Sequence, residues 1–164
     1  MAPDSAAGAA VLSPAQPHDA AWMQRALELA YAARSVDEVP VGAVVVQDGR
    51  LLAESYNLTR TEYDPTAHAE LVALRRAARA AGSARLTAAD VYVTLEPCAM
   101  CAGALVLARI RRLVYAAPDP KTGMCGSLGC IVQDPRLNHR MLLTAGVLAA
   151  PAGELLREFF RQRR

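Results

Sequence analysis

The segment Pro97-Cys98-Ala99-Met100-Cys101, taken together with His68-Ala69-Glu70, constrains the fold more than any other part of the chain. A catalytic zinc ion is held by three protein ligands of nitrogen and sulfur type, with a fourth position left open for water. Cys98 and Cys101 have the i, i+3 spacing, so a helix that begins near Pro97 places both sulfur atoms on one face. Proline suits such a start because it has no N–H group to leave unpaired. Partial positive charge at the helix N-terminus also favours the thiolates that a metal requires.

His68 is the candidate for a third ligand, and Glu70 for a catalytic group beside it. Asp64 is a good N-cap and Pro65 a good first helical residue, so a second helix is expected to begin here. His68 and Glu70 then fall in its opening turn or just after it, from where both can reach a metal lying off the helix end. A carboxylate next to a zinc-bound water can take its proton and later deliver it to a leaving group. The remaining histidines lie in a Pro/Ala-rich tail and in a late polar loop: His18 and His139.

A CxxC pair on its own has two other common interpretations. It can be half of a structural zinc site, whose fourth ligand would here be Cys125 or Cys130, or it can be a redox pair. Glu70 argues against a closed structural site, since such a site needs no spare carboxylate. Four cysteines, two of them assigned to a metal, fit a reducing cytosol. Cys125 and Cys130 are therefore expected to be free thiols.

The apolar pattern predicts a three-layer α/β/α sandwich around a central mixed sheet of about five strands. Helices are expected over residues 19–34, 65–81, 98–109 and 151–164. Strands are expected over residues 41–47, 51–56, 91–95, 111–116 and 141–144. Asp48-Gly49 predicts a hairpin turn between the first two strands. Each later strand is separated from the next by a helix or a long loop, which favours largely parallel pairing. Asp19 is expected to cap the first helix, whose predicted apolar stripe is Met23, Leu27, Ala30 and Tyr31.

A single domain is expected over residues 18–164, preceded by a flexible extension over residues 1–17. The extension is rich in Ala, Pro and Ser and shows no sustained periodicity. No apolar run approaches the roughly 20 residues of a membrane span, so no membrane partner is expected. The N-terminus lacks the basic start of a secretory signal, and a cytoplasmic location is expected. A net charge of +2 is too small to indicate a nucleic-acid partner by itself.

Two later segments are candidates for substrate contact. The segment from residue 119 to residue 138 reads as a long polar loop, and such loops in compact domains are usually functional or disordered. The C-terminal helix ends with adjacent Phe and Arg residues, from Phe159 to Arg164. This ending fits an ordinary cationic turn that complements the helix dipole. It equally fits a stacking and phosphate-binding surface for single-stranded RNA.

His-x-Glu followed by Pro-Cys-x-x-Cys is the signature of the zinc nucleobase deaminases. More narrowly, the chain resembles the bacterial tRNA adenosine deaminases from about residue 19 to the C-terminus. The matching segments are residues 39–43, Asn57, 64–70, 94–101, Asp119 with 121–123, 138–140 and 159–164. The chain departs from the family pattern at Gly129-Cys130, where a bulky apolar residue and then an acidic one are expected.

The resemblance implies a cytidine-deaminase-like fold and hydrolytic deamination of adenosine to inosine at the wobble position of tRNA. In that reaction a zinc-activated water attacks the base, and Glu70 relays protons. The resemblance also implies one Zn2+ per chain, held by His68, Cys98 and Cys101, a homodimer, and a tRNA anticodon stem-loop as partner. The substrate-binding candidates are Asn57, Asp119, Lys121, Thr122, Ser127, Phe159, Phe160 and Arg161.

Two other functions share parts of this pattern. A free-nucleobase deaminase acting on guanine or cytosine would have the same zinc motif, so that motif does not separate it from a tRNA deaminase. The Phe/Arg ending and, by resemblance, the loop with Asp119, Lys121 and Thr122 favour a polymer substrate. A non-catalytic zinc module that only binds RNA or a partner subunit would not need Glu70.

Overall fold

The structure is a computed structural model that describes residues 9–163. Its five strands form a single sheet in the order β2-β1-β3-β4-β5. The strands are β1 (Gly42–Gln47), β2 (Arg50–Tyr56), β3 (Ala89–Leu95), β4 (Arg112–Ala117) and β5 (Leu142–Ala145). The helices are α1 (Asp19–Ser35), α2 (Ala69–Ala81), α3 (Ala99–Leu107), α4 (Ala149–Arg161) and the short 3-10 helix η1 (Ile131–Gln133). Within the described residues, no helix has the length and hydrophobicity needed to span a membrane.

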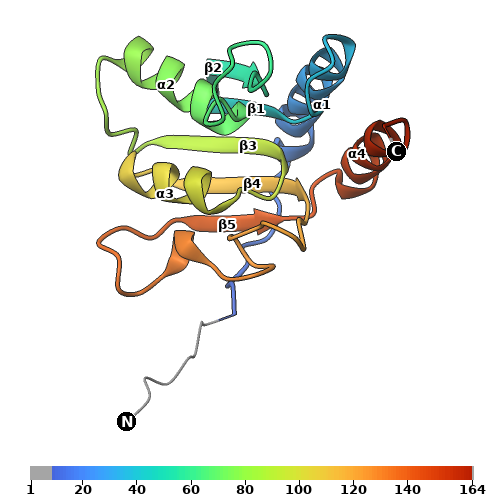
Figure 1. Ribbon diagram of the computed structural model, residues 1–164. Helices are drawn as coiled ribbons and strands as arrows, with labels where there is room; N and C mark the ends of the chain where they lie inside the picture. The colour runs from blue at the N-terminus through green and yellow to red at the C-terminus, as the bar shows by residue number, and fades with distance from the viewer. Residues whose placement is uncertain (1–8, 164) are drawn as a thin grey trace.

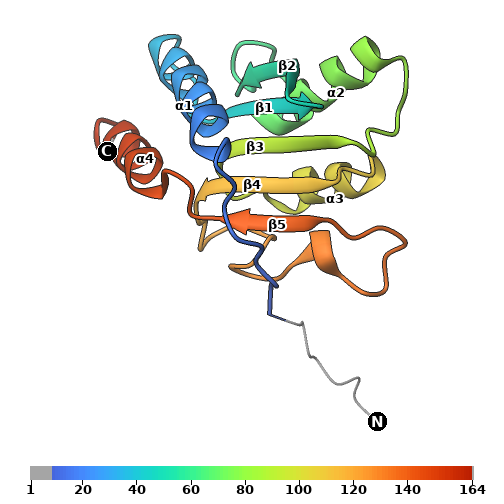
Figure 2. The same ribbon diagram turned by 180° about the vertical axis from the view of Figure 1, so that it is seen from behind.

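The helices lie in two layers on opposite faces of the sheet (Figures 1 and 2). Helices α2 and α3 cover one face, while α1 and α4 cover the other. Successive residues of β1 point to opposite faces, so Val45 packs in the cluster with α2 and α3 and Val44 in the cluster with α1. Both residues are fully buried, which explains why this strand is apolar on both faces. The predicted three-layer sandwich with five strands is confirmed.

Strands β1 and β2 form the predicted hairpin. Asp48 and Gly49 both have positive φ, 52° and 72°, the combination that a type I′ turn requires. Strands β3 and β4 pair in parallel, as do β4 and β5. The expectation of largely parallel pairing is wrong for β1 and β3, which pair antiparallel. The α2 crossover keeps β3 parallel to β2, and because β1 lies between these two strands it runs against both of them.

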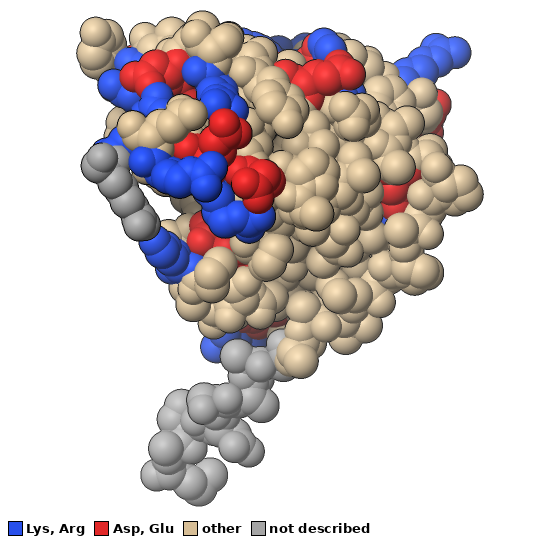
Figure 3. All heavy atoms as spheres, turned by 90° about the vertical axis from the view of Figure 1, so that its right-hand side faces the viewer, with Lys and Arg blue, Asp and Glu red and all other residues tan. Residues whose placement is uncertain are grey.

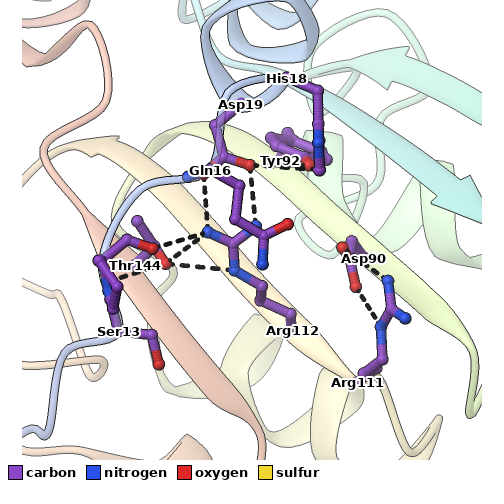
Figure 4. A network of polar contacts seen from close by, with 10 residues as sticks. Ser13, Gln16, His18, Asp19, Asp90, Tyr92, Arg111, Arg112 and Thr144 are labelled. Carbon is purple, nitrogen blue, oxygen red and sulfur yellow. Dashed lines mark hydrogen bonds and ion pairs between the residues drawn. The ribbon is translucent and has the colours of Figure 1, made fainter. Parts of the chain in front are cut away.

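Asp19 has a different role from the predicted helix cap. His18 is the N-cap residue of α1, and Asp19 is the first residue of the helix. The buried Asp19 carboxylate accepts hydrogen bonds from both Nη atoms of Arg112, at 2.8 and 2.7 Å, and from the Tyr92 hydroxyl at 3.0 Å (Figure 4). Burial raises the pKa of Asp19, but these hydrogen bonds more than offset it and hold the pKa below its ordinary value. Arg112 also donates to the Thr144 hydroxyl at 2.7 Å, so the pair joins α1 to three strands.

The buried face of α1 is rotated relative to the predicted apolar stripe. Met23, Leu27 and Ala30 are buried as expected, but Tyr31 is 52% exposed. Each residue is rotated by about 100° from the one before it in a helix, so Tyr31 lies well outside the face marked by Ala30. Ala26 and Ala33 complete the buried face instead.

The N-terminal segment from residue 11 to residue 16 crosses the edge strand β5 on its way to α1 (Figure 2). The Ser13 N–H donates to the Leu143 carbonyl at 2.7 Å. The Gln133 side chain bonds to both the N–H and the carbonyl of Val11, each at 2.8 Å. The expectation that residues 1–17 lie outside the fold is therefore wrong for this segment, because an edge strand offers unpaired backbone groups that a neighbouring chain can use. Residues 1–8 lie outside the described residues.

We predict that Arg112→Met strongly destabilises the protein, because it leaves the Asp19 carboxylate buried without its charged partner. Removing one member of a buried pair costs about 3–5 kcal/mol. The midpoint of urea unfolding, followed by circular dichroism, should fall by more than about 1 M. Arg25→Met is the control, since Arg25 pairs with Glu54 at a site where the arginine side chain is 44% exposed. Exposed pairs contribute only about 0–1 kcal/mol. Equal midpoints for the two variants would contradict the prediction.

Candidate active site

His68, Cys98 and Cys101 meet where α2 and α3 begin. His68 is the N-cap residue of α2, Cys98 is the N-cap residue of α3, and Cys101 lies in the first turn of α3. The Nδ1 atom of His68 lies 3.5 Å from the Sγ of Cys101 and 3.7 Å from the Sγ of Cys98. All three ligand atoms lie within 4.8 Å of one another. Two helix N-termini therefore point at one group of potential metal ligands.

The spacing of these atoms fits a tetrahedral zinc ion. With Zn–N of about 2.0–2.1 Å and Zn–S of about 2.3 Å, a tetrahedral centre separates nitrogen and sulfur by about 3.6 Å. The two measured separations, 3.5 and 3.7 Å, bracket that value. Among the described residues, Cys125 and Cys130 are not members of this group. Their thiols contact the carbonyl of Pro97 and the Gln133 side chain, each at 3.9 Å. The arrangement fits three protein ligands with a fourth position free.

The start of α2 differs from the prediction. The helix begins at Ala69, whereas the sequence suggested Pro65. Asp64 closes a separate turn, in which its Oδ1 accepts hydrogen bonds from the N–H of Thr66 at 2.8 Å and from its hydroxyl at 2.7 Å. Asp side chains favour such turns as much as helix caps, since both satisfy a backbone N–H group. The expected position of His68 and Glu70 at the opening of the helix is confirmed.

The two cysteines of the site have opposite shifts in pKa when no metal is present. The hydrogen bond with Cys101 and the contact with His68 lower the pKa of the Cys98 thiol to about 3. The same hydrogen bond, together with burial, raises the pKa of Cys101. The hydrogen bond with Cys98 also raises the pKa of His68. The site thus holds one thiolate beside one thiol, and a dication favours loss of the remaining proton.

Glu70 lies in the first turn of α2 and is 5% exposed. Burial raises the pKa of Glu70 to about 7, which the nearby His68 opposes only partly. A carboxyl group that titrates near neutral pH can both accept and release a proton, as a relay must. The structure therefore places a candidate acid and base directly beside the potential metal ligands.

A cavity of about 180 Å³ opens next to this group. Its apolar wall includes Val39, Val41 and Leu95, and its polar wall includes Asn57 and Glu70. Pockets for drug-sized ligands are typically about 300–1,000 Å³, so this cavity suits a single ring system.

Asn57 is fixed at the cavity wall by a buried acid, Glu38. The Asn57 Nδ2 donates to the Glu38 carboxylate at 3.3 Å and to the Thr59 hydroxyl at 3.1 Å. Glu38 also accepts the backbone N–H groups of Arg60 and Thr61, at 2.9 and 2.6 Å. Burial raises the pKa of Glu38, but these hydrogen bonds bring it below its ordinary value. Glu38 was not predicted as a site residue, although an acidic residue directly before the matched segment 39–43 is a usable signal.

The loop that follows β4 forms another side of the cavity. Asp119 and Thr122, both predicted site residues, line it. The Asp119 carboxylate accepts the N–H groups of Lys121 and Thr122, at 3.0 and 3.2 Å, which holds the turn together. Lys121 is exposed. Ser127 does not line the cavity, and its N–H and hydroxyl both donate to Glu96.

The two aromatic residues of the C-terminal helix differ in exposure. Phe159 is 2% exposed, and the Arg163 guanidinium stacks 3.5 Å above its ring. The prediction that Phe159 contacts substrate is therefore wrong, because its ring fills the space beneath α4. Phe160 is 48% exposed and Arg161 is exposed, so both remain accessible. Figure 3, which faces the right-hand side of Figure 1, shows arginines interleaved with acidic side chains.

Comparison with known sequences identifies clear relatives. The family model of MafB19-like deaminases matches residues 18–164. The tRNA-specific adenosine deaminase of Haemophilus influenzae is 48% identical over 147 residues, which cover 89% of this chain and 85% of the relative. The tRNA-specific adenosine deaminase of Bacillus subtilis is 44% identical over 146 residues, which cover 89% of this chain and 91% of the relative.

Comparison with solved structures agrees with the sequences. A structure from studies of A-to-I editing by tRNA:A34 deaminases at the wobble position has a TM-score of 0.79 and is 47% identical, covering 83% of this chain and 99% of its own. A guanine deaminase from Nitrosomonas europaea has a TM-score of 0.75 at 28% identity, covering 94% of this chain and 89% of its own. The fold is therefore shared by enzymes for different substrates. The sequence identity separates them, since it is 44–48% for the tRNA adenosine deaminases and 28% for this guanine deaminase. On these grounds the chain belongs to the family of tRNA-specific adenosine deaminases.

Proposed function

We propose that this protein hydrolyses adenosine to inosine and ammonia at the wobble position of a tRNA. The observation that carries the proposal is the position of Glu70, a buried carboxylate beside the group of His68, Cys98 and Cys101 and on the wall of a cavity that suits a single ring system such as a purine. The relatives at 44–48% identity support the choice of substrate. A tRNA substrate also agrees with the expected cytoplasmic location.

When bound by the three ligands, zinc supplies a water molecule whose pKa falls toward about 7. Glu70 would relay both protons of that water in turn. The first goes to N1 of the purine ring, where it stays, and the second goes to the departing amino group, which leaves as ammonia. The Glu70 pKa of about 7 in the metal-free protein suits both transfers at neutral pH. Val41 and Leu95 hold the ring by apolar contact, and Asn57, fixed by Glu38, orients it through its side-chain amide. Atoms balance, since one water enters and one ammonia leaves.

Recognition of a polymer needs contacts beyond the cavity. An anticodon-loop base is already unpaired, so bringing it into the cavity costs less than removing it from a duplex. We propose that Asp119, Lys121 and Thr122 contact the anticodon stem-loop at the cavity edge. Phe160 and Arg161 supply an exposed ring and an exposed cation for stacking and phosphate binding.

A free-nucleobase deaminase is the second candidate, because a guanine deaminase shares the fold at a TM-score of 0.75. The cavity could accept a free base without any loop or tail contact. The guanine deaminase from Nitrosomonas europaea is 28% identical to this chain, well below the 47% of the tRNA:A34 deaminase structure, and this difference favours the tRNA substrate.

We predict that the purified protein holds one zinc ion per chain and that Glu70→Ala keeps it. Turnover of this variant should fall by at least about 10²–10⁴-fold, because a lost proton relay typically has that effect. Cys98→Ala is the matched comparison, and it should lose both the zinc and the activity. Metal analysis by mass spectrometry and an inosine assay would measure the two effects. Near-normal turnover by Glu70→Ala would contradict the assignment of Glu70 as the proton relay.

We predict that the protein converts an anticodon-loop adenosine in bulk tRNA to inosine and leaves free adenine, guanine, cytosine and adenosine unchanged. Phe160→Ala should weaken tRNA binding by about 1–3 kcal/mol, the typical effect of one lost stacked base. Arg161→Ala should reduce the slope of binding against salt concentration, as loss of a phosphate contact does. Arg157→Ala is the control, since Arg157 lies on the same helix and pairs with Glu154. Deamination of free guanine or cytosine without tRNA activity would favour the second candidate.

We also propose a homodimer, on the basis of the family resemblance. Helix α3 starts at the ligand group, and Leu107, at the opposite end of the helix, is 80% exposed, so it offers an apolar side chain to a contact that follows this helix. Sedimentation equilibrium at micromolar concentration should give twice the chain mass of 17.5 kDa. Leu107→Glu should shift the protein toward the single-chain mass, because it places a charge in the contact. A stable monomer of the unmodified protein would contradict the proposal.

A further inference from the structure

Glu96 is a buried acid that the proposed reaction does not use. It lies between β3 and α3, directly before Pro97, and is 2% exposed. Its Oε1 accepts the backbone N–H groups of Cys125 and Ser127, at 3.0 and 2.9 Å. Its Oε2 accepts the N–H of Asp119 at 2.9 Å and the Ser127 hydroxyl. All four donors belong to one segment, the loop of residues 119–127.

The four hydrogen bonds leave Glu96 without a free acceptor position. An ionised carboxylate offers about four lone-pair sites, and each of the four is directed at a donor of the loop. A proton relay needs at least one oxygen that can reach the substrate or its water. Although Glu96 borders the cavity, both of its carboxylate oxygens are occupied by donors of the loop.

The loop is also packed against the segment that carries the metal ligand Cys98. A Cβ atom at Gly123 would lie 2.3 Å from the Glu96 carboxyl carbon, so only glycine allows this approach. The Met124 N–H donates to the Pro97 carbonyl at 2.9 Å, and Gly123 pairs with Cys98 as an isolated β-bridge. The position of the loop is therefore tied to the position of the ligand segment.

We infer that Glu96 is a positioning residue that holds the 119–127 loop in the conformation that receives a polynucleotide. Asp119 is both a donor to Glu96 and a lining residue of the cavity, and its carboxylate orients Thr122. Loss of the Glu96 contacts would release both side chains from the cavity edge without removing Glu70 or a metal ligand. The role in substrate binding rests on the proposed function, whereas the hold on the loop does not.

A proteolysis experiment tests the hold on the loop independently of activity. Lys121 is the only lysine of the chain, so a lysine-specific endoprotease has one target bond, Lys121–Thr122, inside the loop. Glu96→Gln keeps the shape of the side chain but replaces one acceptor oxygen with an NH2 group, which leaves at least one loop N–H unpaired. We expect cleavage to become at least about tenfold faster, with one zinc per chain retained. Ser127→Ala, which removes one donor only, should give a smaller increase.

Two controls separate local loosening from general effects. Glu154→Gln makes the same chemical change at an exposed position of α4 and should leave the cleavage rate unchanged. Global unfolding also gives the protease access to the backbone around Lys121, so Arg112→Met gives the cleavage rate expected from lost stability alone. The inference is overturned if Glu96→Gln is cut no faster than the unmodified protein. It is also overturned if Glu96→Gln is cut no faster than Arg112→Met when the two are compared at urea concentrations that give them the same free energy of unfolding.

Steady-state kinetics separate a positioning role from a catalytic one. For an anticodon stem-loop RNA, we expect Glu96→Gln to raise KM by about tenfold while kcat changes less than about threefold. A fall in kcat of about 10²-fold or more at constant KM would instead identify a proton relay and overturn the inference. If Glu96→Gln does not fold, Ser127→Ala must still raise both KM and the cleavage rate, or the inference fails. If Glu96→Gln is cleaved faster but the unmodified protein does not deaminate tRNA, the hold on the loop is supported and the proposed function is contradicted.

Discussion

A zinc ion held by one nitrogen and two sulfur atoms would require them to lie about 3.6 Å apart, and the arrangement of two helices in this fold meets that requirement. The candidate ligands come from the starts of two helices that follow different strands. Both helices must therefore cover the same face of the sheet and begin at the same end of it. The order β2-β1-β3-β4-β5 achieves this because α2 follows β2 and α3 follows β3. A ligand at the N-cap of each helix then brings His68 Nδ1 to within 3.7 Å of both sulfur atoms. Partial positive charge from both helix ends reinforces the thiolate character of the site.

Four buried acids show how surroundings decide what a carboxylate does. Asp19 is neutralised by Arg112, while Glu38 and Glu96 each accept several hydrogen bonds from neighbouring loops. These three are satisfied within the protein and act as fixed structural anchors. Glu70 is buried without comparable support, and the pKa of its carboxyl group rises to about 7. Among these four acids, Glu70 therefore best suits the proton transfer of the proposed function.

The layers, the strand number and the ligand group were predictable because each depends on local patterns. Asp48-Gly49 specifies its own turn, and Cys98 and Cys101 specify their own spacing. The errors concern choices that only tertiary contacts decide. Asp64 could cap a helix or close a turn, and Asp19 could cap a helix or pair with an arginine far along the chain. Nothing in the local pattern of Phe159 and Phe160 shows which ring is buried.

The contact of the N-terminal segment with β5 bears on how the chain is made. Ser13 meets Thr144, which lies 131 residues later, and Val11 meets Gln133, which lies 122 residues later. A ribosome produces the chain from its N-terminus, so the first of these residues to emerge has no partner until most of the protein has been synthesised. The edge of β5 likewise forms near the end of synthesis. These contacts therefore join some of the earliest-made residues to some of the latest.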